Sequence, residues 1–250
     1  MMQNLLFQEI KYISFCESTN LVLNNIFKEK VLKDNIIIRT DFQTKGVGQK
    51  GNFWESKKGK NLLFSLSIGF ENLLAVSQFY LSAIASLSIV SLLKKYLSNE
   101  IISIKWPNDI YVGGKKIAGI LIENSLIGER IKRSTIGIGI NVNQIIFESD
   151  APNPVSLGAI TYETFELDSL LNEFINEFEK YYIELEAENF EQIKDEYLCI
   201  LYQKDEVCNY IIDNKKQEGV IKGVDEFGFL KMEINGKIRS FDIKEVRYLR

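Results

Sequence analysis

The residues with the clearest chemical potential lie in the run Lys105-Trp106-Pro107-Asn108-Asp109, which a glycine turn separates from Lys116. If residues 113–114 form the tip of a hairpin, Asn108 or Asp109 approaches the Lys116 end of the partner strand. A lysine beside phosphates offsets the negative charge that builds up when a carboxylate attacks a phosphorus atom. The alternative is a purely structural ion pair between Lys116 and Asp109.

The absence of histidine restricts the chemistry further. It excludes Ser-His-Asp and Cys-His nucleophiles, the histidine-containing zinc motifs and histidine acid–base catalysis. Any catalysis must therefore use lysine, carboxylates, backbone amides, hydroxyls or a metal bound through oxygen. Lys116 is our candidate for the fixed cation.

A second candidate is the glycine loop Gly46-Val47-Gly48-Gln49-Lys50-Gly51, which fits the pattern G-x-G-x-x-G. In dinucleotide-binding proteins a helix starts at the third glycine, whereas residues 52–59 carry no helical stripe, so a dehydrogenase is not favoured. Closely spaced glycines still allow backbone N–H groups to turn toward one anion, and Lys45 and Lys50 add positive charge. A hairpin turn with solvated lysines is the alternative.

The composition is that of a globular protein. Of the 250 residues, 46% are hydrophobic, which is enough for one large domain or for a large domain and a small one. The formal net charge is −4, and no run of Lys and Arg is long enough for the one-sided basic surface that duplex binding needs. We therefore expect no nucleic acid partner.

The three cysteines, Cys16, Cys199 and Cys208, share no metal-ligand or redox spacing. This argues against both a disulfide framework and a zinc site. The N-terminus carries neither a basic leader nor a small-residue cleavage site. Together these observations predict a cytoplasmic protein.

The spacing of apolar residues predicts a sheet built from hairpins rather than from βαβ units. Strands are expected at 36–38, 61–69, 101–105, 110–112, 116–123 and 134–142. Helices are expected at 72–93, from Asp168 to about Leu185, and at 190–201. Trp106 is expected in the core, and Lys115, which alternates with Lys116 along its strand, in solvent.

The uncharged segment 72–93 approaches the length that crosses a bilayer. Six polar side chains interrupt it, which favours a buried core helix, and we expect no association with membranes. At about Lys204 the pattern changes to short strands separated by turn signals such as Asp213-Asn214 and Asn235-Gly236. We therefore expect a main domain at 1–203 and a small all-β barrel at 204–250.

An ordered series of motifs extends over most of the chain. The motifs are Glu17-Ser18-Thr19-Asn20, Gln43-Thr44, Trp54, Asn61-Leu62, Lys105-Trp106-Pro107-Asn108-Asp109, Lys116-Ile117-Ala118-Gly119-Ile120-Leu121-Ile122-Glu123 and Gly137-Ile138-Gly139-Ile140-Asn141-Val142-Asn143. In order and spacing they resemble the catalytic domain of biotin protein ligases. The resemblance implies an α+β fold of the class II aminoacyl-tRNA synthetase-like type, with a mixed, largely antiparallel sheet packed with helices and a small C-terminal SH3-like β barrel.

The resemblance also implies the site residues. Those expected to bind biotin are Ser18, Thr19, Asn20, Gln43, Val47, Gly48, Gln49, Lys116 and Gly119. Those expected to bind the nucleotide are Gly46, Gly48, Lys50, Gly51, Trp54, Asn108 and Asn141. Hydroxyls and amides suit a neutral polar ring, and oxygen ligands suit Mg²⁺ held through the ATP phosphates, with Asn108 and Asp109 helping to organise them.

The implied reaction has two steps. The biotin carboxylate attacks the α-phosphorus of ATP, giving biotinyl-5′-AMP and pyrophosphate, with Lys116 at the carboxylate and α-phosphate. A lysine of a biotin carboxyl carrier protein, a domain of a biotin-dependent carboxylase, then attacks the mixed anhydride and releases AMP. Asp109 is a candidate base for the second step, and a structural or metal-facing role is its alternative.

Few residues precede Glu17, so we expect a form without the DNA-binding helix-turn-helix of some relatives. Whether the protein is a homodimer stays open at this stage. The glycine loop departs from the family pattern Gly-Arg-Gly-Arg-x-Gly, because Val47 and Gln49 stand where arginines are usual. We hypothesise that backbone amides and Lys116 still hold the adenylate, but less tightly.

Two other functions are weighed against this one. A lipoate or octanoate protein ligase of the same superfamily is the closest, and the polar set Ser18, Thr19, Asn20 and Gln43 favours biotin over it. A non-catalytic module that binds biotin or a nucleotide is the other. The presence of Lys116 and of the run 105–109 favours catalysis.

We predict that Lys116→Ala costs orders of magnitude in turnover, because a charge that stabilises the transition state is lost. Biotin transfer to a carrier domain, followed by mass spectrometry, measures the effect. Near-normal turnover of the variant would refute the assignment of Lys116.

Overall fold

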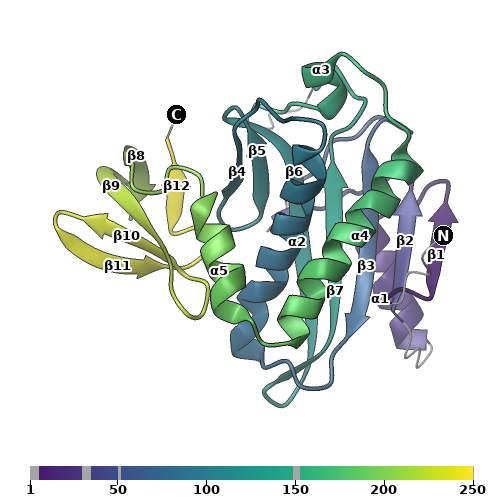
Figure 1. The fold of residues 1–250 in the computed structure, drawn as a ribbon, viewed down its shortest axis with the longest axis horizontal. Helices are drawn as coiled ribbons and strands as arrows, with labels where there is room; N and C mark the ends of the chain where they lie inside the picture. Colours follow the sequence, from purple (N-terminus) through teal and green to yellow (C-terminus); the bar gives the residue numbers. More distant parts are fainter. Residues whose placement is uncertain (1–5, 30–34, 50–51, 149–152, 250) are drawn as a thin grey trace.

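The computed structural model describes residues 6–29, 35–49, 52–148 and 153–249. A seven-stranded sheet forms the centre of the molecule, and a second sheet of five strands lies beside it (Figure 1). The strand order of the large sheet is β1-β2-β3-β7-β6-β5-β4. Only β1 and β2 pair in parallel, and all the other neighbours are antiparallel. The prediction of a mixed, largely antiparallel sheet is confirmed.

The strands of the large sheet are β1 (Glu9–Ile13), β2 (Ile36–Thr40), β3 (Leu62–Gly69), β4 (Ile102–Lys105), β5 (Asp109–Val112), β6 (Lys115–Ile127) and β7 (Arg130–Ile140). The helices are α1 (Thr19–Glu29), the 3-10 turn η2 (Ala75–Ser77), α2 (Gln78–Lys94), α3 (Leu157–Thr161), α4 (Leu167–Glu186) and α5 (Phe190–Cys199). The sequence analysis missed β1, α1 and α3. β1 is a short edge strand of five residues whose side chains are mostly exposed.

Helices cover both faces of the sheet, and successive side chains of β2 pack alternately on the two faces. Ile37 belongs to the main core, under α2 and α4, whereas Ile36 and Ile38 pack with Leu23 of α1 in a separate cluster. Successive strand residues point to opposite faces. The continuous apolar run 36–38 is therefore the pattern of a strand buried on both sides.

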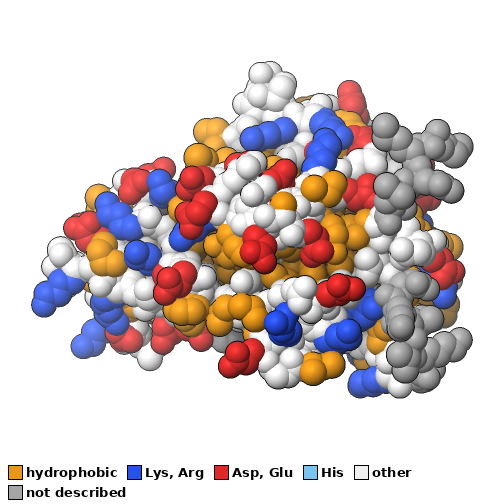
Figure 2. Space-filling model, turned by 60° about the horizontal axis from the view of Figure 1, so that its bottom comes forward, with side chains coloured by type: hydrophobic (Ala, Val, Ile, Leu, Met, Phe, Trp, Pro, Cys, Tyr) orange, Lys and Arg blue, Asp and Glu red, His pale blue; other side chains and the backbone are white. Residues whose placement is uncertain are grey.

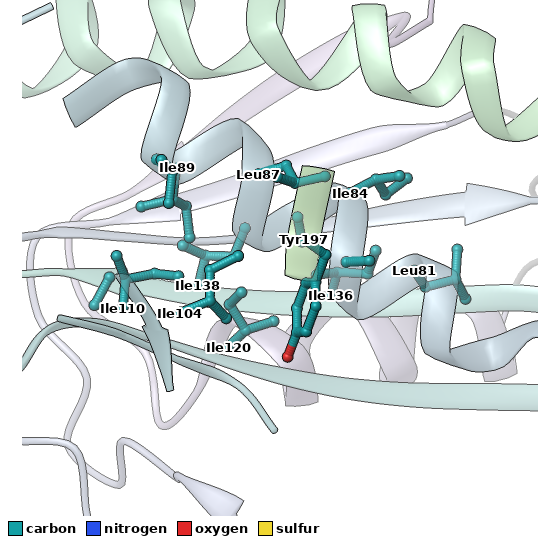
Figure 3. Packing of buried hydrophobic residues seen from close by; sticks show 14 of the residues in the cluster. Leu81, Ile84, Leu87, Ile89, Ile104, Ile110, Ile120, Ile136, Ile138 and Tyr197 are labelled. Atoms are coloured by element: carbon teal, nitrogen blue, oxygen red, sulfur yellow. The ribbon is translucent and has the colours of Figure 1, made fainter. Parts of the chain in front are cut away.

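Strand β7 alternates in a different way. Ile136, Ile138 and Ile140 are buried in the main core, where Figure 3 shows Ile136 and Ile138 among side chains such as Leu81 and Ile84 of α2. Gly137 and Gly139 come between them and point to the opposite face. Over residues 136–140, one face of β7 is thus filled with isoleucine, and the other carries no side chains.

Helix α2 is the apolar segment expected at 72–93. Together with η2 it is long and apolar enough to cross a membrane, but 72% of its apolar window is buried inside the protein. Two of its serines donate to backbone carbonyls: Ser88 Oγ bonds to Ile84 O at 2.6 Å, and Ser82 Oγ bonds to Pro107 O at 3.0 Å. The prediction of a core helix is confirmed.

The second sheet contains β8 (Val207–Ile212), β9 (Lys215–Val224), β10 (Leu230–Ile234), β11 (Lys237–Phe241) and β12 (Val246–Tyr248), in the order β11-β10-β9-β8-β12. The predicted turns Asp213-Asn214 and Asn235-Gly236 join its hairpins, and all four residues have positive φ, as a two-residue type I′ turn requires. In the described part of the chain no ladder joins β11 to β12. The sheet is consistent with the predicted SH3-like barrel, but the barrel is not closed.

The two sheets share one core. Trp106, buried as predicted, donates its Nε1–H to Gly228 O at 2.9 Å, which ties the start of the β4–β5 turn to the second sheet. Tyr197 of α5 packs edge-on against Phe79 of α2, with ring centroids 5.1 Å apart. The main hydrophobic cluster includes residues of both sheets. The division at residue 204 stays a prediction.

We predict that Phe174→Ala lowers the free energy of unfolding by about 3–5 kcal/mol, because it leaves a cavity in a close-packed core. Phe174 of α4 is fully buried, and its ring centroid lies 5.0 Å from that of Phe64 in β3. Urea denaturation measures the change. Ile183→Ala, at an exposed position of the same helix, is the control and is expected to change stability by no more than about 0.5 kcal/mol. Equal losses in both variants would contradict the prediction.

Candidate active site

A cavity of about 940 Å³ opens on the face of the large sheet that carries α1 and extends toward β8 and β12 of the second sheet. Most of the residues predicted for the site line it: Ser18, Thr19, Asn20, Gln43, Val47, Gly48, Gln49, Trp54, Asn108, Asp109, Lys116 and Gly119. These residues come from five separate segments of the chain. The tertiary structure therefore brings together residues that are far apart in the sequence.

Two described residues that were predicted for the site, Gly46 and Asn141, do not line the cavity. Gly46 is buried behind it, where a Cβ would lie 2.8 Å from Trp54 O. Asn141 is only 3% exposed and donates its Nδ2–H to Val155 O at 3.1 Å, so its amide supports the neighbouring loop. Its Oδ1 is buried without a hydrogen-bond partner. Lys50 and Gly51 lie outside the described residues.

One end of the cavity is a chain of hydroxyls and amides at the start of α1. Gln43 Oε1 accepts from Thr19 N at 2.8 Å, so this side chain caps the first turn of the helix. Ser65 Oγ donates to Asn20 Oδ1 at 2.6 Å, and it also contacts Thr19 Oγ1 at 2.6 Å. Because Ser65 has only one proton, Thr19 must be the donor in that second contact, in preference to its longer contact with Gln43 Oε1 at 3.2 Å. The remaining lone pair of Thr19 Oγ1 can then accept from a ligand.

Asn20 is held on both sides of its amide group. Its Nδ2 donates to Glu123 Oε2 at 2.8 Å, while its Oδ1 takes the proton of Ser65. Its side chain also occupies the space that a Cβ on Gly137 would need. Glu123 and Gly137 lie within the sequence motifs, but no role was predicted for them, and Ser65 was not predicted as a site residue. The one signal for Ser65 was its position as a polar residue inside the apolar run of β3.

Lys116 lies at the centre of the cavity. Its Nζ is 2.6 Å from Asp109 Oδ1 and 5.4 Å from the centroid of the Trp54 ring, and both charged side chains are about one-fifth exposed. Its backbone is fixed by the loop after β7, because Lys116 N donates to Asn153 O at 2.8 Å and Lys116 O accepts from Val155 N at 2.9 Å. The predicted approach of Asp109 to Lys116 is confirmed. Lys115 is exposed, also as predicted.

Trp54 rests on a pair of glycines that face each other across β6 and β7. Gly119 and Gly139 are direct partners in the ladder. A Cβ on Gly139 would lie 2.5 Å from Trp54 Cε2, and a Cβ on Gly119 would lie 2.9 Å from Trp54 Cζ3 and 3.4 Å from Lys116 Nζ. The indole therefore occupies space that only glycine leaves open, and the ammonium group of Lys116 lies at ordinary contact distance from the Gly119 position.

The glycine loop folds back as a small hairpin. Trp54 N donates to Gly46 O at 2.9 Å, Gly48 N donates to Asn52 O at 2.7 Å, and Val47 pairs with Phe53. Lys45 pairs with Glu17 at 3.0 Å near the surface. No helix begins between residues 52 and 60, as expected. With the N–H of Gly48 already bonded, the described part of the loop has the form of the hairpin-turn alternative, and its binding of an anion stays a prediction.

Asn108 lines the cavity, but its hydrogen bonds go to the neighbouring strand β6. Its Nδ2 donates to Ile120 O at 2.5 Å, and its own carbonyl accepts from Ile120 N at 3.0 Å. This double contact fastens the start of β5 to β6. It thereby fixes the backbone of the neighbouring Asp109.

Tyr248 of the second sheet lines the cavity, although it was not predicted for the site. Lys105 Nζ donates to Tyr111 OH at 3.1 Å and lies 4.5 Å from the ring centroid of Tyr248 in β12. Burial raises the pKa of the Tyr248 hydroxyl well above its usual range. Burial also raises the pKa of the Cys208 thiol, so this cavity residue stays protonated and does not supply a thiolate nucleophile near neutral pH.

Residues 12–141 match the model of the biotin/lipoate A/B protein ligase family. The chain belongs to this family. The match includes every motif of the site from α1 to the end of β7, among them the Gly119–Gly139 pair and the contact between Lys116 and Asp109. It excludes the second sheet, and hence Tyr248.

The chain is also similar to curated relatives that are named as ligases. The chain is 28% identical over 211 residues to chloroplastic biotin–protein ligase 1 of Arabidopsis thaliana, covering 83% of this chain and 56% of that protein. It is 27% identical over 255 residues to the bifunctional ligase/repressor BirA of Bacillus subtilis, covering 95% of this chain and 74% of that one. The chain thus spans little more than half the length of the Arabidopsis protein.

Among solved structures, the biotin protein ligase of Aquifex aeolicus in complex with biotin and ATP superposes with a TM-score of 0.78 at 25% identity. The similarity covers 98% of this chain and 100% of that one, so it includes the second sheet. The same fold therefore extends over both sheets in that ligase.

We predict that Gly139→Ala displaces Trp54 from the sheet and shifts its fluorescence emission to longer wavelength, because the added methyl group overlaps the indole. Trp54 and Trp106 are the two tryptophans of the chain, so the spectrum of Trp54→Phe isolates the signal of Trp54. Gly69→Ala is the matched control on the same sheet, since its methyl group meets the flexible end of Arg133. An unchanged emission in Gly139→Ala would show that the indole does not rest on this strand.

Proposed function

We propose that the protein is an ATP-dependent biotin protein ligase. It forms biotinyl-5′-AMP from biotin and ATP and then transfers biotin to a lysine of a biotin carboxyl carrier protein. The observation that carries the proposal is that a single cavity joins a half-buried cation, Lys116, to a pocket of hydroxyls and amides at the start of α1. The named relatives and the Aquifex structure support the same activity.

The pocket matches the polar ring of biotin in its hydrogen-bonding groups. A ureido group offers one carbonyl acceptor and two N–H donors. Thr19 Oγ1 has a lone pair left to accept, and among the described residues Gln43 Nε2 has no hydrogen-bond partner, so it can donate. Ser18, at the first turn of α1, adds a hydroxyl. A lipoyl ring, with its two sulfur atoms, would leave these groups unpaired, which costs binding energy.

In the first step Lys116 offsets charge. The biotin carboxylate and the α-phosphate repel each other, and negative charge grows on the phosphate as the carboxylate attacks. Lys116 Nζ is held 2.6 Å from Asp109, so a negatively charged ligand competes for an ammonium group that is already in place. The positioning costs no reorganisation at the moment of reaction. Trp54 supplies a flat wall beside this cation.

In the second step the attacking amine of the carrier lysine must lose a proton. Asp109 lies next to Lys116, at the place where the mixed anhydride is held, and we propose it as the acceptor of that proton. This role needs the carboxylate to leave its contact with Lys116 as the adenylate takes over the ammonium group. The two steps then share the same pair of residues in turn.

Mg²⁺ fits the site only through the nucleotide. Among the described residues no group of three or more acidic or cysteine side chains forms a cage for a metal ion, and Asp109 is the only carboxylate among the described residues that line the cavity. One carboxylate together with phosphate oxygens is a common set for Mg²⁺. The ion would supply charge neutralisation at the phosphates, while Lys116 acts at the carboxylate.

We propose further that the protein acts in the cytoplasm on a carrier domain and does not bind nucleic acid. On the face shown in Figure 2, Lys and Arg side chains alternate with Asp and Glu and form no continuous basic band. The three cysteines are unpaired. With Val47 and Gln49 at the cavity in place of the usual arginines, adenylate retention falls to Lys116 and the backbone.

The activity is tested by incubating the protein with ATP, Mg²⁺, a carrier domain and either biotin or lipoate. The mass added to the carrier lysine identifies the substrate, and biotinyl-adenylate measured with and without carrier separates the two steps. The exposed Lys115→Ala is the matched control for Lys116→Ala. Lipoate addition would replace the proposal with lipoylation, and no adenylate with either acid would overturn it.

A further inference from the structure

The indole of Trp54 is placed at the centre of the site without a polar contact of its own. Its Nε1 is buried and has no hydrogen-bond partner, and its ring touches glycines and the ammonium group of Lys116. Dispersion and a cation–π contact do not by themselves select one ring position. The position must therefore be set by the backbone on either side of Trp54.

That backbone is tied to a buried glutamine. Gln144 is 2% exposed, and its amide makes four hydrogen bonds. Its Oε1 accepts from Lys57 N at 2.7 Å and from Asn61 Nδ2 at 2.8 Å. Its Nε2 donates to Glu55 Oε1 at 3.1 Å and to Ile146 O at 2.9 Å. The amide has no donor or acceptor capacity left.

Three of the four partners lie in residues 55–61, directly after Trp54. Two further contacts strengthen the same link: Glu55 Oε1 also accepts from Glu148 N at 2.9 Å, and Asn61 Oδ1 accepts from Val142 N at 3.0 Å. The segment after Trp54 is thus fastened to residues 142–148. These residues continue from β7, the strand that contains Gly139.

We propose that Gln144 is a positioning residue for the ligase reaction, holding Trp54 over Gly119 and Gly139 and so keeping the indole against Lys116. Because Gln144 follows β7 directly, it places the indole relative to the strand on which the indole rests. Gln144 lies outside the cavity lining and outside residues 12–141. Its effect on catalysis rests on the proposed function, but its effect on Trp54 does not.

Gln144→Glu tests the proposal with little change of shape. The carboxylate keeps the acceptor for Lys57 N and Asn61 Nδ2 but loses the donor, and it faces the carboxylate of Glu55. We expect Trp54 emission to shift to longer wavelength and its quenching by acrylamide to rise. We expect kcat/KM for biotinylation to fall by about tenfold or more, as misplacement of a site group by a fraction of an ångström does.

Glu55→Gln combined with Gln144→Glu reverses the donor and the acceptor. The amide introduced at position 55 then donates to the carboxylate introduced at position 144, at the cost of the bond from Glu148 N, which meets the same Oε1 atom of Glu55. The donor to Ile146 O stays lost, so we expect the double variant to recover part of the emission and of kcat/KM. Asn143→Ala is the matched control, because it removes two side-chain hydrogen bonds from the adjacent residue to Phe165 and keeps the backbone bond from residue 143 to Lys60 O. Thermal melts of all four proteins check that they fold.

A shift in Gln144→Glu, with recovery in the double variant and none in Asn143→Ala, supports the proposal. Unchanged emission, no recovery in the double variant, or an equal shift in Asn143→Ala would overturn it and leave Gln144 a structural residue. The fluorescence needs no substrate. A protein that shows the shift and the recovery without biotinylation would therefore refute the proposed function and not the role of Gln144.

Discussion

The site depends on one steric constraint, the absence of side chains at the facing residues Gly119 and Gly139 of β6 and β7. A Cβ at either position would overlap the indole of Trp54, so only this pair leaves room for it on the sheet. The opposite face of the same strands is filled by Ile120, Ile138 and their neighbours, which pack under α2. Because successive side chains point to opposite faces of the sheet, one face packs in the hydrophobic core and the other lines the open site.

The polar end of the cavity is built on the same principle. Gly137, two residues before Gly139, makes the space that Asn20 fills, and Asn20 in turn orders Ser65 and Thr19 by hydrogen bonds. In a low-dielectric environment each of these polar groups needs a hydrogen-bond partner, so each hydrogen bond in the series has a defined donor and a defined acceptor. This assignment determines which atoms remain to meet a ligand, and it favours a ring with both donors and acceptors.

The position of charge follows from burial in the same way. The pair of Lys116 and Asp109 is shielded enough to hold a defined geometry and open enough for a ligand to replace one partner. A fully exposed pair would be worth little, and a fully buried pair would resist exchange. Lys116, the central cation of this acidic chain, thus stays available for an anionic substrate. Trp54 lies on one side of it and the start of β5 on the other.

The sequence by itself determined the hairpin-rich sheet, the buried helix α2, the type I′ turns of the second sheet and the identities of most cavity residues. These are local properties: periodicity, turn-forming residues and short motifs depend on neighbours a few positions away. It could not predict α1 or β1, whose stability comes from packing on β2 rather than from their own pattern. Nor could it predict the indole on Gly139, the links from Gln144 to Glu55 and Lys57, or Tyr248 beside Lys105, since these contacts join residues distant in the chain. Only the tertiary structure decides them, because they depend on which faces of the strands meet in space.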